Sequence, residues 1–107
     1  EGPHAISKSN KVKFKKGIVI SNEPGYYEKN KFGIRIENLI YTKKNKNRLI
    51  FENLTMAPID KNLIDNSILD KDEKVWINNY HKKVNEKLKS FMNKKEAEEL
   101  KRACSAI

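Results

Sequence analysis

The first half of the chain carries the alternating apolar and polar positions of β-strands. Three such stretches, GIVISNEP, FGIRIENLIYT and RLIFENLTMAP, lie between Lys11 and Pro58. Pro24 and Gly25, and later the polar segment KKNKN, separate them as turn residues do. Because the connections are short, we expect three consecutive strands that pair as an antiparallel meander.

The alternation in FGIRIENLIYT divides its side chains between two faces of a strand. One face carries three isoleucines and an asparagine: Ile34, Ile36, Asn38 and Ile40. The other face carries Arg35, Glu37, Leu39 and Tyr41. Since two of these last four side chains are large and mostly apolar, we expect the second face to be covered rather than open to water.

The second half has the spacing of three to four residues that is typical of amphipathic helices. Asp70 and Glu73 are spaced as an N-cap and an N3 acid, so a helix is expected to begin there. An apolar stripe follows, made of Trp76, Tyr80, Val84, Leu88 and Phe91. A second short helix over about Lys94 to Cys104 could bury Ala97, Leu100 and Cys104. The sequence therefore predicts an α+β fold, with antiparallel strands followed by helices.

The charge of the chain raises the question of a polyanionic partner. The 107 residues are one domain at most, or part of a larger one, and their net charge of +9 suggests nucleic acid or a membrane. The excess is nearly all scattered lysine, and arginine appears only at positions 35, 48 and 102. Arginine makes most specific base and phosphate contacts, so we do not expect a nucleic-acid partner. No apolar stretch approaches the roughly 20 residues that span a bilayer, so we expect no membrane partner.

The ends of the chain suggest a cellular compartment. Cys104 is the only cysteine, so no internal disulfide can form, which favours a reduced, cytoplasmic location. The N-terminal segment EGPHAISKSN has neither a starting methionine nor the apolar region of a signal peptide. We expect the chain to have been cut from a longer protein.

Two glutamates and an arginine form the candidate site. Arg35 and Glu37 are two residues apart, so on a strand their side chains leave the same face, roughly 6.6 Å apart along the chain. Glu23 lies at the end of the preceding strand, so antiparallel pairing can bring its carboxylate beside that of Glu37. Adjacent carboxylates repel unless a cation lies between them. Hard oxygen ligands suit Mn²⁺, Mg²⁺, Ca²⁺ and, together with histidine, Zn²⁺ or Co²⁺.

The residues alone leave a simpler interpretation open. Glu23 could be an ordinary surface residue, and Arg35 and Glu37 an ordinary ion pair, since such pairs are common and stabilise little.

The stretches SNEPGYY and FGIRIEN resemble the pita-bread metallopeptidase family, which includes aminopeptidase P, prolidase and methionine aminopeptidase. The resemblance implies that Glu23 and Glu37 are metal ligands and that Glu23 is also the catalytic proton shuttle. It further implies that Arg35 and Tyr27 support these ligands from nearby positions.

The resemblance covers almost the whole chain. EGPHAIS resembles the segment after the catalytic histidine of the family, while LIFENLTMAPID and WINNYHKKV resemble the tail of the longer, cytosolic type of aminopeptidase P. Residues 1–65 would then be the C-terminal part of the catalytic domain, and residues 66–107 a helical C-terminal tail.

The family resemblance also implies a function and its limits. The family binds two metal ions with five residues, and the two aspartates and the histidine that precede the glutamates are absent from this sequence. The histidine expected directly before Glu1 is absent as well. The resemblance implies a cytosolic X-prolyl aminopeptidase that uses two divalent ions, with Mn²⁺ the expected metal, to release a residue that precedes proline. It implies that this fragment alone is inactive, and that the full-length enzyme forms a homodimer through its C-terminal region.

Two other interpretations remain open, a prolidase-like relative and a non-catalytic basic binding module. The tail argues against the first, and steeply salt-dependent RNA binding would favour the second. Three further residues are expected to have no catalytic role. His4 stands where the family does not demand histidine, His81 is expected to pack or cap, and Cys104 has no histidine partner that the sequence shows.

Overall fold

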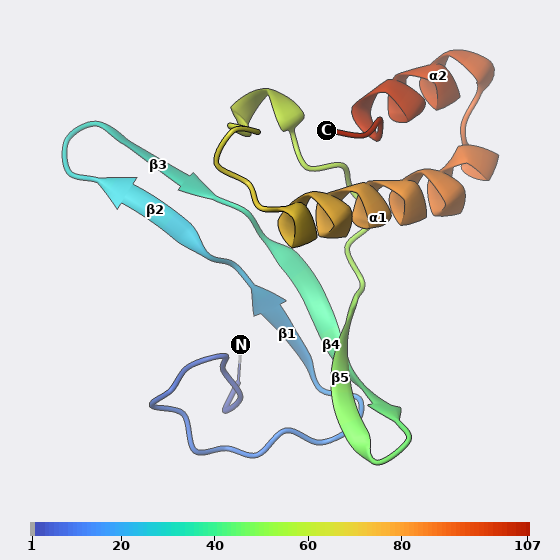
Figure 1. Ribbon diagram of the computed structural model, residues 1–107. Coiled ribbons are helices and arrows are strands. Elements are labelled where there is room, and N and C mark those ends of the chain that lie inside the picture. The colour runs from blue at the N-terminus through green and yellow to red at the C-terminus, as the bar shows by residue number, and fades with distance from the viewer. Residues whose placement is uncertain (1) are drawn as a thin grey trace. The chain divides into compact units, whose positions relative to one another are not determined.

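The computed structural model describes residues 2–107. The chain divides into two compact units, Glu1–Thr55 and Met56–Ile107. The strands of the described residues lie in the first unit and the helices in the second (Figure 1). The predicted α+β class, with antiparallel strands before helices, is confirmed.

The first unit contains a three-stranded antiparallel sheet and a two-stranded hairpin (Figure 1). The sheet has the order β1-β4-β5 and consists of Val19–Asn22, Asn38–Asn45 and Arg48–Asn53. The hairpin pairs β2 (Gly25–Glu28) with β3 (Phe32–Arg35). The predicted antiparallel pairing of the three stretches is confirmed, because β1, β4 and β5 correspond to GIVISNEP, FGIRIENLIYT and RLIFENLTMAP and pair in that order. The hairpin of β2 and β3 that intervenes between β1 and β4 was not predicted.

The hairpin and the β1-β4 pair are two halves of one antiparallel ribbon. Asn22 pairs with Asn38 and Gly25 pairs with Arg35, so the register continues unchanged across the gap between them. The predicted single strand FGIRIENLIYT is interrupted at residues 36 and 37. Pro24 explains the interruption, because it has no N–H to donate to the ladder, although its carbonyl still accepts from the Ile36 N–H at 3.2 Å.

The buried face of the ribbon is opposite to the expected one. In β4 the buried side chains are Asn38, Ile40 and Thr42, while Leu39 is 45% exposed. Ile20 and Ile40 pair directly across the strands and are both buried, so this apolar pair fixes which face turns inward. The expectation that the face with Arg35 and Glu37 is covered is therefore wrong for the described residues.

Buried polar groups in the first unit are hydrogen-bonded. The Thr42 hydroxyl accepts from the Ile18 N–H at 2.9 Å and donates to the Lys15 carbonyl, which holds the segment before β1 against β4. The Asn38 side-chain amide donates to Asn53 Oδ1 at 3.3 Å, joining β4 to the end of β5. The Thr42 contacts support the register of β1 and β4 that the candidate site requires, while the Asn38 contact attaches β5 to β4.

The second unit contains two α-helices and two short 3₁₀ helices. η1 spans Lys61–Leu63, α1 spans Lys71–Leu88, η2 spans Lys89–Phe91 and α2 spans Lys94–Ala103. The predicted N-cap of the first helix is confirmed, since Asp70 and Glu73 form a reciprocal capping box with bonds of 2.8 and 3.0 Å.

The core of the second unit forms around three buried residues, Tyr80, Val84 and Leu100. Partly buried residues pack around them: Met56, Ile59, Leu88, Met92 and Cys104. Only the middle of the predicted stripe is thus buried. Phe91 is 85% exposed because it lies in η2, beyond the end of α1, and Trp76 stacks on Tyr80 from an exposed position with ring centroids 5.6 Å apart. Among residues 2–107 no helix combines the length and the apolar character needed to cross a membrane.

Candidate metal centre

The two predicted carboxylates lie at opposed positions on the ribbon. The pairs on either side, Asn22 with Asn38 and Gly25 with Arg35, keep one register, which sets Glu23 across from Glu37. Side chains of opposed residues leave the same face of an antiparallel pair. The predicted approach of Glu23 to Glu37 thus follows from the pairing of the strands.

Arg35 joins the two carboxylates. Its Nε atom is 3.8 Å from Glu23 Oε2 and 3.9 Å from Glu37 Oε2. All three side chains are about half exposed, so neither ion pair stabilises the chain strongly. One guanidinium facing two carboxylates leaves an excess of negative charge at this place, which favours a further cation.

Ser21 supports Glu23 from the same strand. Its hydroxyl donates to Glu23 Oε1 at 2.6 Å, a short bond of the kind that carboxylates accept. The two residues are two apart, so their side chains leave the same face. Ser21 was not predicted as a site residue, because its spacing of two from Glu23 is only a weak signal in the sequence.

Tyr27 lies on the same face of the ribbon, two residues beyond Gly25. Its ring extends over Gly33, its partner across the hairpin, and over Gly25. A Cβ atom at Gly25 would come within 2.6 Å of the Tyr27 hydroxyl. The structure therefore brings together all four predicted site residues, Glu23, Glu37, Arg35 and Tyr27, on one face of one ribbon.

The two carboxylates of the candidate site are suitable ligands for a hard divalent cation, but they are only part of a complete ligand set. Glu23 and Glu37 offer carboxylate oxygens from opposed positions, the ligand type that Mg²⁺, Mn²⁺ and Ca²⁺ prefer. Within residues 2–107, however, no group of three or more His, Cys, Asp or Glu side chains is arranged to hold a metal ion. Glu23 and Glu37 are therefore two candidate ligands, and a complete metal centre would need others.

A pocket of about 620 Å³ adjoins Glu23. Its walls include His4 and Ile6 from the N-terminal segment and Ser21 and Glu23 from β1 and the residue pair after it. The His4 ring packs against Phe14, with centroids 5.5 Å apart. Glu23 is thus one of the residues that line this pocket.

His81 lies in the second unit, where it joins α1 to the segment that precedes η1. It is fully buried, and its Nε2 atom accepts the Ile59 N–H at 3.1 Å. Burial, helped by the nearby Lys61 ammonium, lowers the pKa of His81. The lowered pKa favours the neutral imidazole, and of the two roles that the sequence suggested, packing or capping, the buried position agrees with packing.

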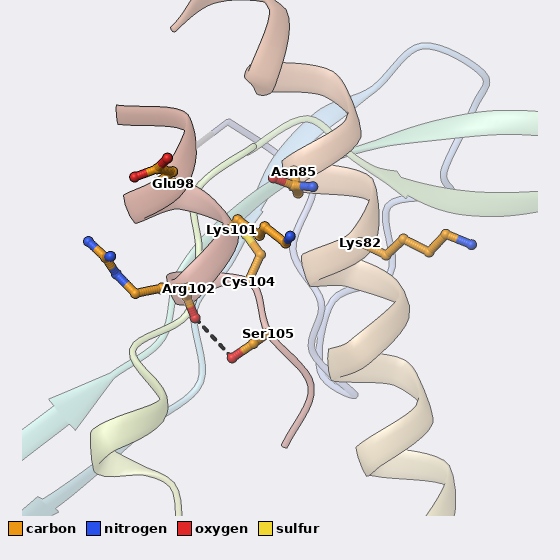
Figure 2. Close-up of a pocket in the computed structure, with 7 residues that line it drawn as sticks. All are labelled: Lys82, Asn85, Glu98, Lys101, Arg102, Cys104 and Ser105. Carbon is orange, nitrogen blue, oxygen red and sulfur yellow. Dashed lines mark hydrogen bonds between the residues drawn. The ribbon is translucent and has the colours of Figure 1, made fainter. Parts of the chain in front are cut away.

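A second pocket, of about 630 Å³, lies between α1 and α2 and contains Cys104 (Figure 2). Figure 2 shows the charged ends of Lys82, Glu98 and Arg102 directed away from the thiol. Burial raises the pKa of Cys104, with Lys61 acting in the opposite direction. A thiol with a raised pKa is less often in the thiolate form that acts as a nucleophile.

Sequence comparisons match both units to one family. The model of metallopeptidase family M24 matches residues 1–44, and that of the C-terminal region of peptidase M24 matches residues 47–107. A probable Xaa-Pro aminopeptidase P from Laccaria bicolor is 40% identical over 100% of this chain and 19% of its own length. One from Talaromyces stipitatus is 44% identical over 90% of this chain and 16% of its own.

A solved structure shares the fold. It is the crystal structure of X-prolyl aminopeptidase from Caenorhabditis elegans, described as a cytosolic enzyme with a di-nuclear active site. The TM-score is 0.76 and the identity 35%, over 88% of this chain and 17% of that one. The chain therefore spans less than a fifth of the length of the relatives named here.

Proposed function

Since the chain belongs to metallopeptidase family M24, we propose that it is the C-terminal part of a metal-dependent X-prolyl aminopeptidase. Such an enzyme hydrolyses the bond between an N-terminal residue and a following proline. The observation that carries the proposal is the opposed pair Glu23 and Glu37, joined through Arg35, within the part of the chain matched to the family. The aminopeptidase P names of its relatives support the substrate class.

Glu23 and Glu37 are proposed as ligands of two divalent ions, with Mn²⁺ as the metal. Their opposed carboxylates fit hard cations, and the di-nuclear active site of the Caenorhabditis elegans enzyme supports the number of ions. When bound, such ions activate a water molecule and polarise the scissile carbonyl. The remaining ligands must come from other parts of the protein, so we expect the isolated chain to be inactive.

The residues that this chain contributes to the proposed site have different roles. Glu23 moves a proton between water and the departing amine, while Ser21 fixes one of its two oxygens. Glu37 would serve as a second carboxylate ligand of the ions. Arg35 lies between the carboxylates and holds their orientation, and Tyr27 brings a hydroxyl to the same face.

The wider assignments follow from the same proposal. Residues 1–65 would be the end of the catalytic domain and residues 66–107 its helical tail. The full-length protein would act in the cytosol, as the Caenorhabditis elegans enzyme is described to do, and would form a homodimer through the C-terminal region. The half-exposed Trp76, stacked on Tyr80, is a suitable contact for a second subunit.

A pair of substitutions in the full-length protein tests the proposal. Glu23→Gln and Glu37→Gln keep the size of each side chain and remove its charge. We expect each to lower kcat/KM for a peptide with proline at the second position more than roughly 100-fold, because residues that merely support ligands already contribute 10- to 100-fold. We also expect fewer bound Mn²⁺ ions per chain in titration calorimetry.

Glu28→Gln is the matched control. Glu28 belongs to the same ribbon but faces away from the site and pairs with Lys31 at 2.7 Å. We expect it to retain activity and metal stoichiometry. If Glu23→Gln and Glu37→Gln behaved like Glu28→Gln, the proposed function would be wrong.

A further inference from the structure

We propose that Gly25 and Gly33 together form a seat for the ring of Tyr27, and that this seat holds the Tyr27 hydroxyl against the Glu23, Arg35 and Glu37 cluster. The seat is a positioning device for the proposed metal centre, so its purpose rests on the proposed function. Neither glycine acts on a reacting atom itself.

The first half of the seat is Gly33. It pairs with Tyr27 across the hairpin, so a side chain there would leave the same face as the tyrosine. A Cβ atom at Gly33 would lie 2.6 Å from Cδ1 and 3.0 Å from Cε1 of the Tyr27 ring. Because these atoms belong to the part of the ring nearest the backbone, a methyl group at Gly33 would force the whole ring to swing away.

The second half is Gly25. A Cβ atom there would lie 2.6 Å from the Tyr27 hydroxyl oxygen and 2.9 Å from ring atoms Cε2 and Cζ. The ring therefore runs along the strand from Tyr27 back toward Gly25, whose partner across the hairpin is Arg35. Since Arg35 lies between Glu23 and Glu37, this direction brings the hydroxyl to the neighbouring pair of positions on the ribbon.

The backbone does not require glycine at either position. Neither Gly25 nor Gly33 has the positive φ that side chains avoid, whereas Gly2 and Gly17 do, with φ of 104° and 86°. At Gly2 and Gly17 a Cβ atom would meet nothing within 4 Å. At Gly2 and Gly17 the backbone conformation favours glycine. At Gly25 and Gly33 glycine is favoured because the Tyr27 ring occupies the space that a Cβ atom would need.

The exposure of Tyr27 explains why a seat is useful. The residue is 66% exposed, so the apolar contacts that normally fix a ring are few. Because Gly25 and Gly33 have no side chains, the Tyr27 ring can lie directly against the backbone of both strands. Tyr26, the next residue, offers a contrast: it is 63% exposed on the opposite face, and its ring packs against Phe32 with centroids 6.0 Å apart.

A double-mutant cycle in the full-length, Mn²⁺-loaded protein tests the seat. We expect Gly33→Ala to lower kcat about 10- to 100-fold, since a displacement of about 1 Å at a catalytic group can cost 100-fold. We expect KM and the number of bound Mn²⁺ ions to stay unchanged. We expect Tyr27→Phe to lower kcat to a similar extent, and Gly33→Ala to cause no further loss in that background.

Tyr26→Ala is the matched control, because Gly33→Ala should retain its full effect in that background. In metal-free protein with ¹³C-labelled tyrosine rings, Gly33→Ala should shift the Tyr27 signals and leave those of Tyr26 in place. A wild-type kcat for Tyr27→Phe, or an equal loss from Gly33→Ala with and without the Tyr27 substitution, would overturn the proposal.

Failure to fold is also informative. If Gly33→Ala prevents folding and Tyr27→Ala restores it, the clash is with the ring, as proposed. If Gly33→Ala prevents folding in both backgrounds, the clash lies elsewhere and the seat is refuted. Glu23→Gln separates the two proposals, because an active Glu23→Gln enzyme refutes the function, whereas an inactive one with a fully active Gly33→Ala enzyme refutes the seat alone.

Discussion

Ser21 fixes one carboxylate oxygen of Glu23 and leaves the other, Oε2, to face Arg35. A carboxylate held in this way presents a defined oxygen to a metal ion, which is how residues around a metal centre raise its affinity. The contribution comes from orientation, since the Ser21 hydroxyl carries no charge.

Removal of that hydroxyl should therefore weaken metal binding. We expect Ser21→Ala in the full-length protein to lower the Mn²⁺ association constant about 10-fold, measured by titration calorimetry. Ser21→Thr, which keeps a hydroxyl on the same β-carbon, should restore most of it. Equal affinities for the alanine and threonine variants would show that the hydrogen bond has no positioning role.

The residues of the candidate site were predictable to different degrees. Glu23 and Glu37 were singled out because the local stretches SNEPGYY and FGIRIEN resemble the family, whereas the residues alone left an ordinary surface interpretation open. The support from Ser21 was missed because a serine two residues from a glutamate is common on strands. The roles of Gly25 and Gly33 could not be foreseen, since they depend on where the Tyr27 ring lies across the hairpin.

At the scale of elements, two hydrogen bonds tie α1 to the segment that precedes η1. Besides the bond from the Ile59 N–H to His81, the Tyr80 hydroxyl donates to the Ala57 carbonyl at 2.8 Å. Because Nε2 of His81 accepts a hydrogen bond, its proton lies on Nδ1, which has no hydrogen-bond partner among the described residues. Protonation of His81 would break the bond to Ile59 and bury a charge.

This attachment should weaken in acid. The pKa of His81 is lowered in the folded state, so as the pH falls below about 6.5 the unfolded state binds the proton first and the folded state loses stability. We expect the Ile59 amide of the full-length protein to be less protected from hydrogen exchange at about pH 5.5 than at about pH 7.5, after correction for the intrinsic rate.

His81→Gln provides the control for this prediction. Glutamine can accept the Ile59 N–H with its side-chain oxygen but does not titrate. Its protection should be nearly independent of pH over the same range. A pH dependence as large as that of the wild type would mean that His81 is not the group responsible.

The helices and strands were predicted well where they depend on interactions between residues close together in sequence. The capping box of Asp70 and Glu73 depends on four consecutive residues, and it begins α1 as expected. The pairing of β1 with β4 was expected from the order of the strands, but the hairpin of β2 and β3 and the break at Ile36 and Glu37 were not. The break depends on Pro24 in the opposite strand, so it could not be read from the alternation of FGIRIENLIYT alone.

At the scale of the whole molecule, the chain carries two ligands of the proposed metal centre on a ribbon that is complete within it. The register that opposes Glu23 to Glu37 is fixed by the buried pair Ile20 and Ile40 and supported by the hydrogen bond from the Ile18 N–H to the Thr42 hydroxyl. The chain spans less than a fifth of the relatives named above, so the remaining ligands, the activity and the substrate are proposals about the longer protein.

The most direct test is anomalous diffraction from crystals of the full-length protein loaded with Mn²⁺. We predict two manganese peaks beside the ribbon, both at coordination distance, about 2.0–2.6 Å, from carboxylate oxygens of Glu37, and at least one at that distance from Glu23. Manganese bound with neither carboxylate as a ligand would contradict the proposed metal centre.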